Sequence, residues 1–201
     1  MLDFNTSARP TNDALERGGV SVLHGADANA RAALTLDIAI HSAADQGGIG
    51  IHGNIKRNEF ALIASPQHRL EGIAKDIWGF ANAKPKIARR AKVNLSQIAS
   101  VHGINSADAA DVLLRGFAAL GRKPALVVID AIEEHHGHDE DNSSELIQFC
   151  NLLAKQSGCH ALLTCKTGSV TNALTSAADK VVELTAHGDG VYAAEFTKSR
   201  T

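Results

Sequence analysis

The sequence predicts an α/β fold with a mostly parallel central sheet, helices on its faces and antiparallel edge strands at the C-terminal end. Apolar segments of strand length alternate with helical patterns as far as Cys165. The stretch from Pro124 to Asp130 holds five consecutive apolar residues, three of them β-branched, which is typical of a strand buried on both faces. Near the C-terminus, Gly188-Asp189-Gly190 separates two further strand patterns and predicts a hairpin.

The first half of the chain predicts two strand–helix units. A strand over 20–23 leads through a loop of small residues into a helix over 32–40, which is rich in Ala and Leu. A second strand over 60–64 precedes an amphipathic helix over 69–82, whose apolar residues recur at helical spacing. We expect Trp78 of this helix to lie in the core, together with Phe80.

The second half continues the alternation around the central strand over 124–130. A strand is predicted over 93–98 and a helix over 106–120, with Ser106 as its cap. After the central strand, the predicted elements are a helix over 143–157, a strand over 160–165 and two late strands over 178–184 and 191–197. Residues 1–17 are expected to be a polar lead-in, and residues 18–201 a single domain.

Composition limits the classes of function. The chain has 201 residues with a formal charge of −2, so nucleic-acid binding would come from a local basic stretch such as 84–92; the alternative for that stretch is a solvated helix face. The three cysteines lack metal-ligand spacing and fit reduced thiols. No apolar run approaches the roughly 20 residues that cross a bilayer, and the start lacks a signal-peptide pattern. These features predict a cytoplasmic protein with no membrane partner.

The loop after the first predicted strand is compared with a phosphate-binding loop, which has a Gly, four residues, then Gly-Lys and Ser or Thr. Gly25 holds the first position, and Ala30, Arg31 and Ala32 stand where the second Gly, the Lys and the hydroxyl belong. Alanine restricts the backbone, Arg is a larger planar fork than Lys, and Ala32 offers magnesium no hydroxyl. Asp27 also puts a negative charge in the loop. The alternative is an ordinary strand-to-helix turn.

Two further features are candidate sites. Asp130 closes the central strand, at the carboxyl edge of the sheet where open α/β folds bind ligands; its alternative role is to cap the next segment. A run of histidines and acids follows, with His135, His136 and His138 as candidate ligands of a transition metal. Because the run is contiguous and has no helical spacing, a solvated loop is the alternative. We expect Asp130 to share one rim of the sheet with the turn at Gly25.

These segments in their order resemble the RecA-fold ATPase core of hexameric helicases, which is a P-loop NTPase fold. The resemblance is closest to the plasmid-replication RepA type, with the DnaB and KaiC-like ATPases further off. It rests on the degenerate loop over 25–32, on the strand over 126–130 with the acidic loop and the helix that ends at Gly158-Cys159, and on the terminal Phe196-Thr-Lys-Ser-Arg200. It covers roughly residues 18–201.

The resemblance implies roles for individual residues. Gly25, Ala30, Arg31 and Ala32 would form the degenerate loop that binds ATP, and Asp130 would hold magnesium through water. The family's catalytic glutamate would follow the second strand, where this chain has Ser65-Pro66-Gln67.

Three more correspondences concern hydrolysis. Gln67 could orient a water molecule but could not accept its proton. Lys198 and Arg200 resemble finger residues that reach the nucleotide of a neighbouring subunit, and Cys165-Lys166 stand where the RepA type carries a His pair that senses phosphate. The family implies a homo-hexameric ring that uses ATP to move along single-stranded DNA.

Three functions follow. The first is a RepA/RecA-like protein with impaired nucleotide chemistry, in which ATP and magnesium bind weakly or not at all. It would act as a binding or assembly module in plasmid or mobile-element DNA replication or maintenance, with replication proteins or single-stranded DNA as partners. The second is a divergent but active single-stranded-DNA motor, with a base supplied by an acid within 133–141. The third is a metal-binding protein that uses the histidine-rich run.

Overall fold

The computed structural model describes residues 3–5, 15–44, 59–97, 106–136, 140–187 and 191–199. Its elements, in chain order, are β1 (Asp3–Asn5), β2 (Val20–Gly25), α1 (Ala28–Ala44), β3 (Glu59–Ser65), α2 (Gln67–Ala83), α3 (Pro85–Ala88), β4 (Val93–Gln97), α4 (Ser106–Ala119), β5 (Lys123–Ile129), α5 (Glu133–His136), α6 (Glu140–Ser157), β6 (His160–Lys166), the 3₁₀ turn η1 (Thr167–Ser169), α7 (Asn172–Ala177), β7 (Lys180–Ala186) and β8 (Val191–Ser199).

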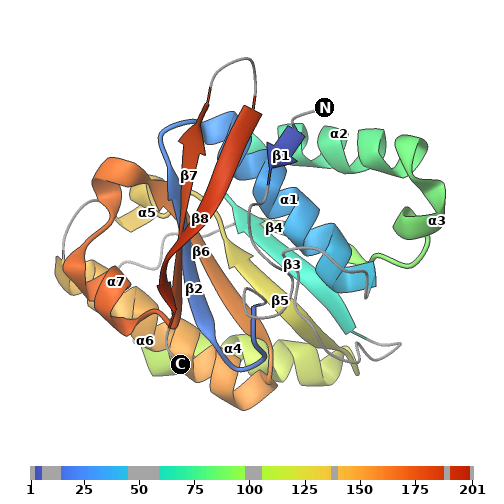
Figure 1. Ribbon diagram of the computed structural model, residues 1–201. Coiled ribbons are helices and arrows are strands. Elements are labelled where there is room, and N and C mark those ends of the chain that lie inside the picture. The colour runs from blue at the N-terminus through green and yellow to red at the C-terminus, as the bar shows by residue number, and fades with distance from the viewer. Residues whose placement is uncertain are drawn as a thin grey trace.

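The described strands form one eight-stranded sheet in the order β1-β8-β7-β2-β6-β5-β3-β4 (Figure 1). The neighbouring strands in it run parallel, apart from the antiparallel pair β7 and β8. The predicted α/β class, with a mostly parallel sheet and an antiparallel pair formed by the last strands, is therefore confirmed. The short strand β1 pairs with β8 and lies within the stretch expected to be a polar lead-in.

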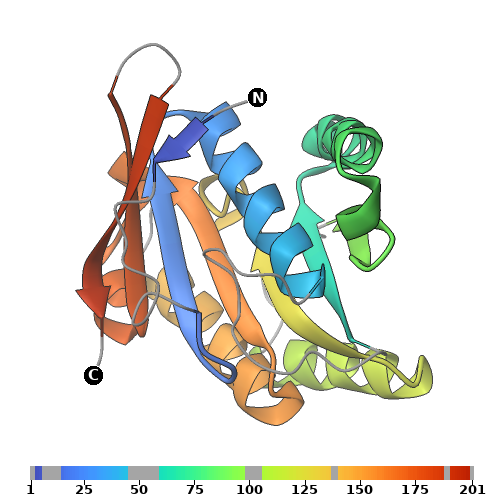
Figure 2. The ribbon, with the colours of Figure 1, turned by 45° about the vertical axis from the view of Figure 1, so that its right-hand side comes forward.

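Helices cover both faces of the sheet. Figures 1 and 2 show α1 lying along one face, with α2 and α3 beside it, while α4 and α6 lie on the other. Three apolar clusters fill these layers. Leu34 and Ile38 of α1 pack with Leu126 and Val128 of β5. On the opposite side, α6 and α7 cover β2 and β6, and Phe117 of α4 packs with Phe60 and Val127. The central strand β5 is buried from Pro124 to Ile129, as its unbroken apolar run predicts.

Most predicted elements are present with shifted ends, and two differences matter for function. Helix α1 begins at Ala28, four residues before the predicted start at 32, so Ala30 and Arg31 lie in its first turn rather than in a loop. The placement of Trp78 in the core was wrong, because its side chain is 71% exposed. The core face of α2 is formed by Ile73, Ile77 and Phe80, and Trp78 points away from that face.

None of the helices in the described part of the chain is both long and apolar enough to span a membrane.

Candidate functional site at the carboxyl edge of the sheet

The turn after β2 and the acid after β5 lie on the same rim of the sheet. Strand β6 lies between β2 and β5 and runs parallel to both. Gly25 pairs in register with Lys166, and Ile129 pairs with Leu163, so the carboxyl ends of all three strands meet at one edge. The expectation of a shared rim is confirmed. Open α/β sheets bind ligands at such an edge, so its side chains are the candidate site.

Asp27 occupies the start of α1. Only Ala26 and Asp27 separate β2 from α1. One carboxylate oxygen of Asp27 accepts hydrogen bonds from the backbone N–H groups of Asn29 at 2.8 Å and Ala30 at 3.1 Å. The other oxygen accepts from the Tyr192 hydroxyl at 2.5 Å. The bond from Tyr192, followed by the one from Ala30, lowers the pKa of Asp27. Asp27 is therefore an N-cap whose negative charge complements the helix dipole.

Arg31 is held inside the protein. Its side chain is 3% exposed, and one terminal nitrogen donates to the carbonyl oxygen of Gly25 at 2.5 Å. The other terminal nitrogen forms an ion pair with the Glu133 carboxylate at 3.0 Å. These contacts tie the β2–α1 turn to the segment that follows β5. The guanidinium charge is therefore directed at a backbone carbonyl and a carboxylate of the same chain.

Gly25 is required by a close approach between strands. A Cβ atom added at Gly25 would lie 2.8 Å from the carbonyl oxygen and 2.9 Å from the Cβ of Leu184 on β7. The residue forms the last position of β2, and it is not one of the described glycines with a positive φ. The packing of β7 against β2 therefore explains this glycine, and phosphate binding is not needed to explain it.

Asp130 ties three neighbouring elements together. It is 1% exposed, and its carboxylate accepts hydrogen bonds from Ser65 of β3 at 2.8 Å and Thr164 of β6 at 2.7 Å. The Nε atom of Arg69 on α2 lies 3.3 Å from the same carboxylate. Ala131 follows with a φ of 54°, a left-handed conformation, and its N–H donates to the Thr164 hydroxyl at 3.0 Å. The carboxylate is thus neutralised and hydrogen-bonded by its own protein.

Two of the acids within 133–141 that could act as a base, Glu133 and Glu134, are paired. Glu133 faces Arg31, and Glu134 lies 3.6 Å from Arg69 and 3.3 Å from the His68 ring. Gln67, at the start of α2, is exposed on the surface. Among the described residues, no group of three or more His, Cys, Asp or Glu side chains is placed to hold a metal ion.

The turn and Asp130 do not fit a magnesium–triphosphate in this arrangement. A phosphate at the start of α1 would meet the Asp27 carboxylate, which already accepts two of the N–H groups that a phosphate would use. Arg31 is neutralised by Glu133, and a cation at Asp130 would compete with Arg69. Ala32 lies in α1 and carries no hydroxyl. The expectation that ATP and magnesium bind weakly or not at all stays a prediction.

The finger residues and the histidine run lie partly outside the described residues. Lys198 pairs through its backbone with Val181, near the amino end of β7, whereas Leu184 of β7 pairs with Gly25. Lys198 therefore lies toward the opposite rim from the turn of its own chain, and its side chain falls outside the described part. Arg200 and His138 lie outside the described residues. His135 and His136 belong to α5, and their side chains are not described.

Sequence reasoning missed several partners in this site. Tyr192 contacts Asp27, and Ser65, Thr164 and Arg69 contact Asp130, yet no local motif links any of them to these acids. Their sequence separation from those acids ranges from 34 residues for Thr164 to 165 for Tyr192, so no spacing signal links them. Only the order of the strands brings them together.

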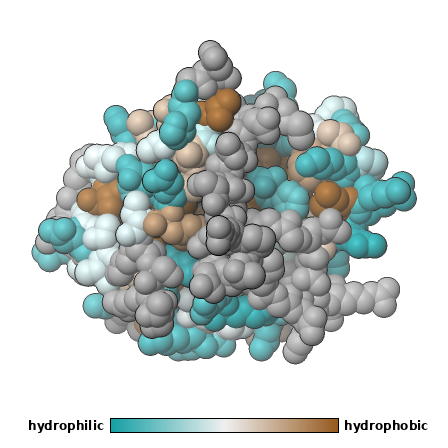
Figure 3. All heavy atoms as spheres, viewed as in Figure 1, coloured by the Kyte–Doolittle hydropathy of each residue, from teal (hydrophilic) through white to brown (hydrophobic). Residues whose placement is uncertain are grey.

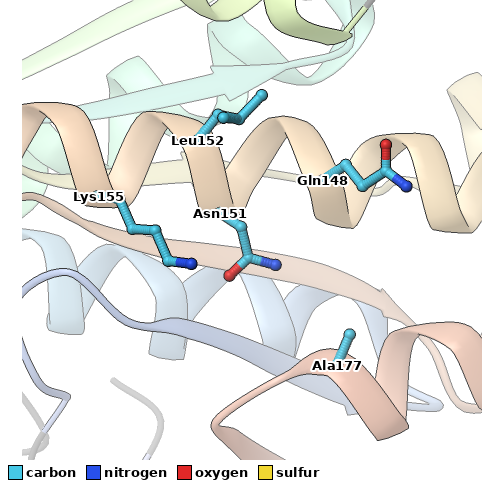
Figure 4. Close-up of a pocket in the computed structure, with 5 residues that line it drawn as sticks. All are labelled: Gln148, Asn151, Leu152, Lys155 and Ala177. Atoms are coloured by element: carbon cyan, nitrogen blue, oxygen red, sulfur yellow. The ribbon is translucent and has the colours of Figure 1, made fainter.

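A separate groove lies between α6 and α7. It has a volume of about 500 Å³ and is lined by Gln148, Asn151, Leu152, Lys155 and Ala177 (Figure 4). The four residues from α6 recur at helical spacing, so they share one face of that helix. None of the residues of the rim described above lines this groove, and the chemistry of the site is not located there.

A comparison with protein-family models finds no match to the chain, and a comparison with curated proteins finds none either.

Proposed function

We propose that this protein is a RecA-like module of the RepA type that does not turn over ATP and that acts by binding or assembly in plasmid or mobile-element DNA replication or maintenance. The observation that carries the proposal is the closed turn after β2. Asp27 takes the position of an anion at the start of α1, and Arg31 is committed to Gly25 and Glu133.

The sizes of the charge repulsion and of the loss of a general base favour a protein without ATP turnover over one with reduced turnover. Two unit charges of the same sign roughly 4 Å apart repel each other by about 4 kcal/mol at an effective dielectric constant near 20. A phosphate beside Asp27 would meet a repulsion of this order without gaining the free charge of Arg31. Loss of a general base costs a further ~10²- to 10⁴-fold in rate, and both nearby acids, Glu133 and Glu134, already face arginines.

Isothermal titration of the full chain with ATP and magnesium tests the proposal. We expect no saturable heat of binding, and no phosphate release above that of an Asp130→Ala variant. Tight magnesium-dependent binding with hydrolysis would refute the proposal and favour the divergent motor. That motor would need the Arg31–Glu133 pair to open, so its phosphate release should depend on single-stranded DNA and should disappear in Glu133→Gln.

The proposal includes self-association into a homo-oligomer, for which the family resemblance implies a hexamer. What supports it is that the backbone of Lys198 lies toward the rim opposite its own turn, so the predicted finger residue does not lie beside that turn in its own chain. Light scattering coupled to size-exclusion chromatography measures the mass of the assembly directly. A mass of one chain at all concentrations would remove this part of the proposal.

A further inference from the structure

Helix α2 displays a large aromatic side chain to solvent. Trp78 is 71% exposed, although Ile73 on the same helix is only 7% exposed. At 3.6 residues per turn, the outward face that carries Trp78 also carries Lys75 one turn before it and Asn82 one turn after it. An exposed Trp contributes nothing to the core, and a flat aromatic surface beside a positive charge is suited to stacking with another planar group.

The segment that follows α2 is strongly basic. Residues 84–92 contain five Lys and Arg residues and no acid. The chain has 20 Lys and Arg in total, so the other 15 face 22 Asp and Glu, and the rest of the molecule is acidic. Arg89 and Arg90 are both exposed, as are Lys86 and Lys92. Positive charge is thus concentrated at one place on a protein of the opposite sign, which makes it a candidate site for a polyanion.

The aromatic and the basic features lie on consecutive helices. Lys84 joins α2 directly to α3, and its ammonium group lies 5.4 Å from the centre of the Phe80 ring, on the core face of α2. Figures 1 and 2 show α2 and α3 together at the outer side of β3 and β4. Figure 3 shows hydrophilic side chains gathered at the end of the molecule where α3 lies. The acids on this part of the chain are Glu71 and Asp76 of α2.

We propose that α2 and residues 84–92 form a binding surface for single-stranded nucleic acid, in which Trp78 stacks on an unpaired base and Arg89 and Arg90 contact phosphates. Stacking on an aromatic side chain needs a base that is not already stacked in a duplex, and phosphate contacts need the positive segment. Both are present on neighbouring helices. This surface is separate from the turn after β2, so the inference does not depend on the proposed loss of ATP turnover.

Because Trp78 is the only tryptophan in the chain, its fluorescence reports on this surface alone. We expect oligothymidylate to quench that fluorescence, and we expect the binding to weaken as salt is raised. A duplex of the same length should bind more weakly and quench less. Equal quenching by duplex, or no binding even at low salt, would overturn the proposal. A change in Trp78 emission that follows protein concentration alone would assign the surface to contacts between copies instead.

Variants separate stacking from general charge. Labelled oligothymidylate reports binding by fluorescence anisotropy, and Trp78→Ala should weaken it by about tenfold. Arg89→Glu with Arg90→Glu should weaken it further and should reduce the slope of log K against log salt by about 1 for each phosphate that is no longer bound. The matched control is Arg122→Glu with Lys123→Glu, an exposed basic pair at the amino end of β5. Circular dichroism checks that each variant is folded.

The control double variant at Arg122 and Lys123 separates an effect of this surface from an effect of net charge. Equal loss of binding in the two double variants would show that only net charge matters, and would overturn the assignment to this surface. Undiminished binding by Trp78→Ala would overturn the stacking contact. ATP titration is a separate measurement, so either result for the nucleotide leaves these outcomes unchanged.

Discussion

Replacement of Arg31 distinguishes an internal ion pair from a nucleotide ligand. The side chains of Arg31 and Glu133 are 3% and 14% exposed, and their charged groups are 3.0 Å apart. Removal of one partner of a buried pair costs about 3–5 kcal/mol because the other charge stays buried and unpaired. Glu133 keeps some contact with water, so we expect a free energy of unfolding about 3 kcal/mol lower in Arg31→Met, which keeps a long side chain.

The assay is urea unfolding followed by circular dichroism, with Glu133→Gln and the double variant completing a cycle. A pair in contact should give an interaction energy of about 1–3 kcal/mol, whereas independent residues add to within about 0.5 kcal/mol. The slope of the transition should not change, so that the midpoint reports stability alone. If Arg31 is instead a phosphate ligand, Arg31→Met should change the midpoint little and should abolish ATP binding. That result would refute the closed-turn reasoning.

Three further perturbations test the local physics of the fold. His160 is fully buried, and burial lowers its pKa to about 4. Below pH 6.5 the unfolded chain therefore binds a proton at this residue that the folded chain does not bind, so the free energy of unfolding should fall by on the order of 3 kcal/mol between pH 6.5 and about 4. Urea midpoints across that range measure the loss, which a His160→Gln variant should not show. Gly25→Ala places a Cβ 2.8 Å from the Leu184 carbonyl oxygen, so thermal unfolding should show a loss of about 1–3 kcal/mol; an unchanged midpoint would contradict the close approach of the strands. Asp27→Ala removes the cap of α1 and should cost about 0.5–2 kcal/mol in the same assay, whereas Asp27→Asn should cost less because Asn also caps; equal losses would show that the charge, and not the cap, stabilises the helix.

The strands and helices were largely predictable because each depends on neighbouring residues. The β-branched run before Asp130 favours extended backbone, and the periodic apolar residues of α2 favour a helix. The expectation for Trp78 failed because its hydrophobicity favours burial, whereas the helical periodicity places it off the core face. The start of α1 was misplaced because an acid before an Ala-rich segment fits a loop as well as a helix cap, and only its hydrogen bonds to the backbone show that Asp27 is a cap.

The candidate site was predictable only in part. The adjacency of the turn and Asp130 follows from parallel strands, whose carboxyl ends meet at one edge, and this holds for any sequence that folds so. The partners of these residues do not follow from any local pattern. Arg31 and Glu133 are 102 residues apart, and Ser65 and Asp130 are 65 apart.

Local backbone preference and apolar spacing thus specified which segments become strands and helices, since both act over a few residues. Whether Arg31 faces a phosphate or a carboxylate depended on which strands became neighbours and on how closely β7 packs against β2. Pairing of charges requires contact in space, and contact is established only when the whole sheet has formed.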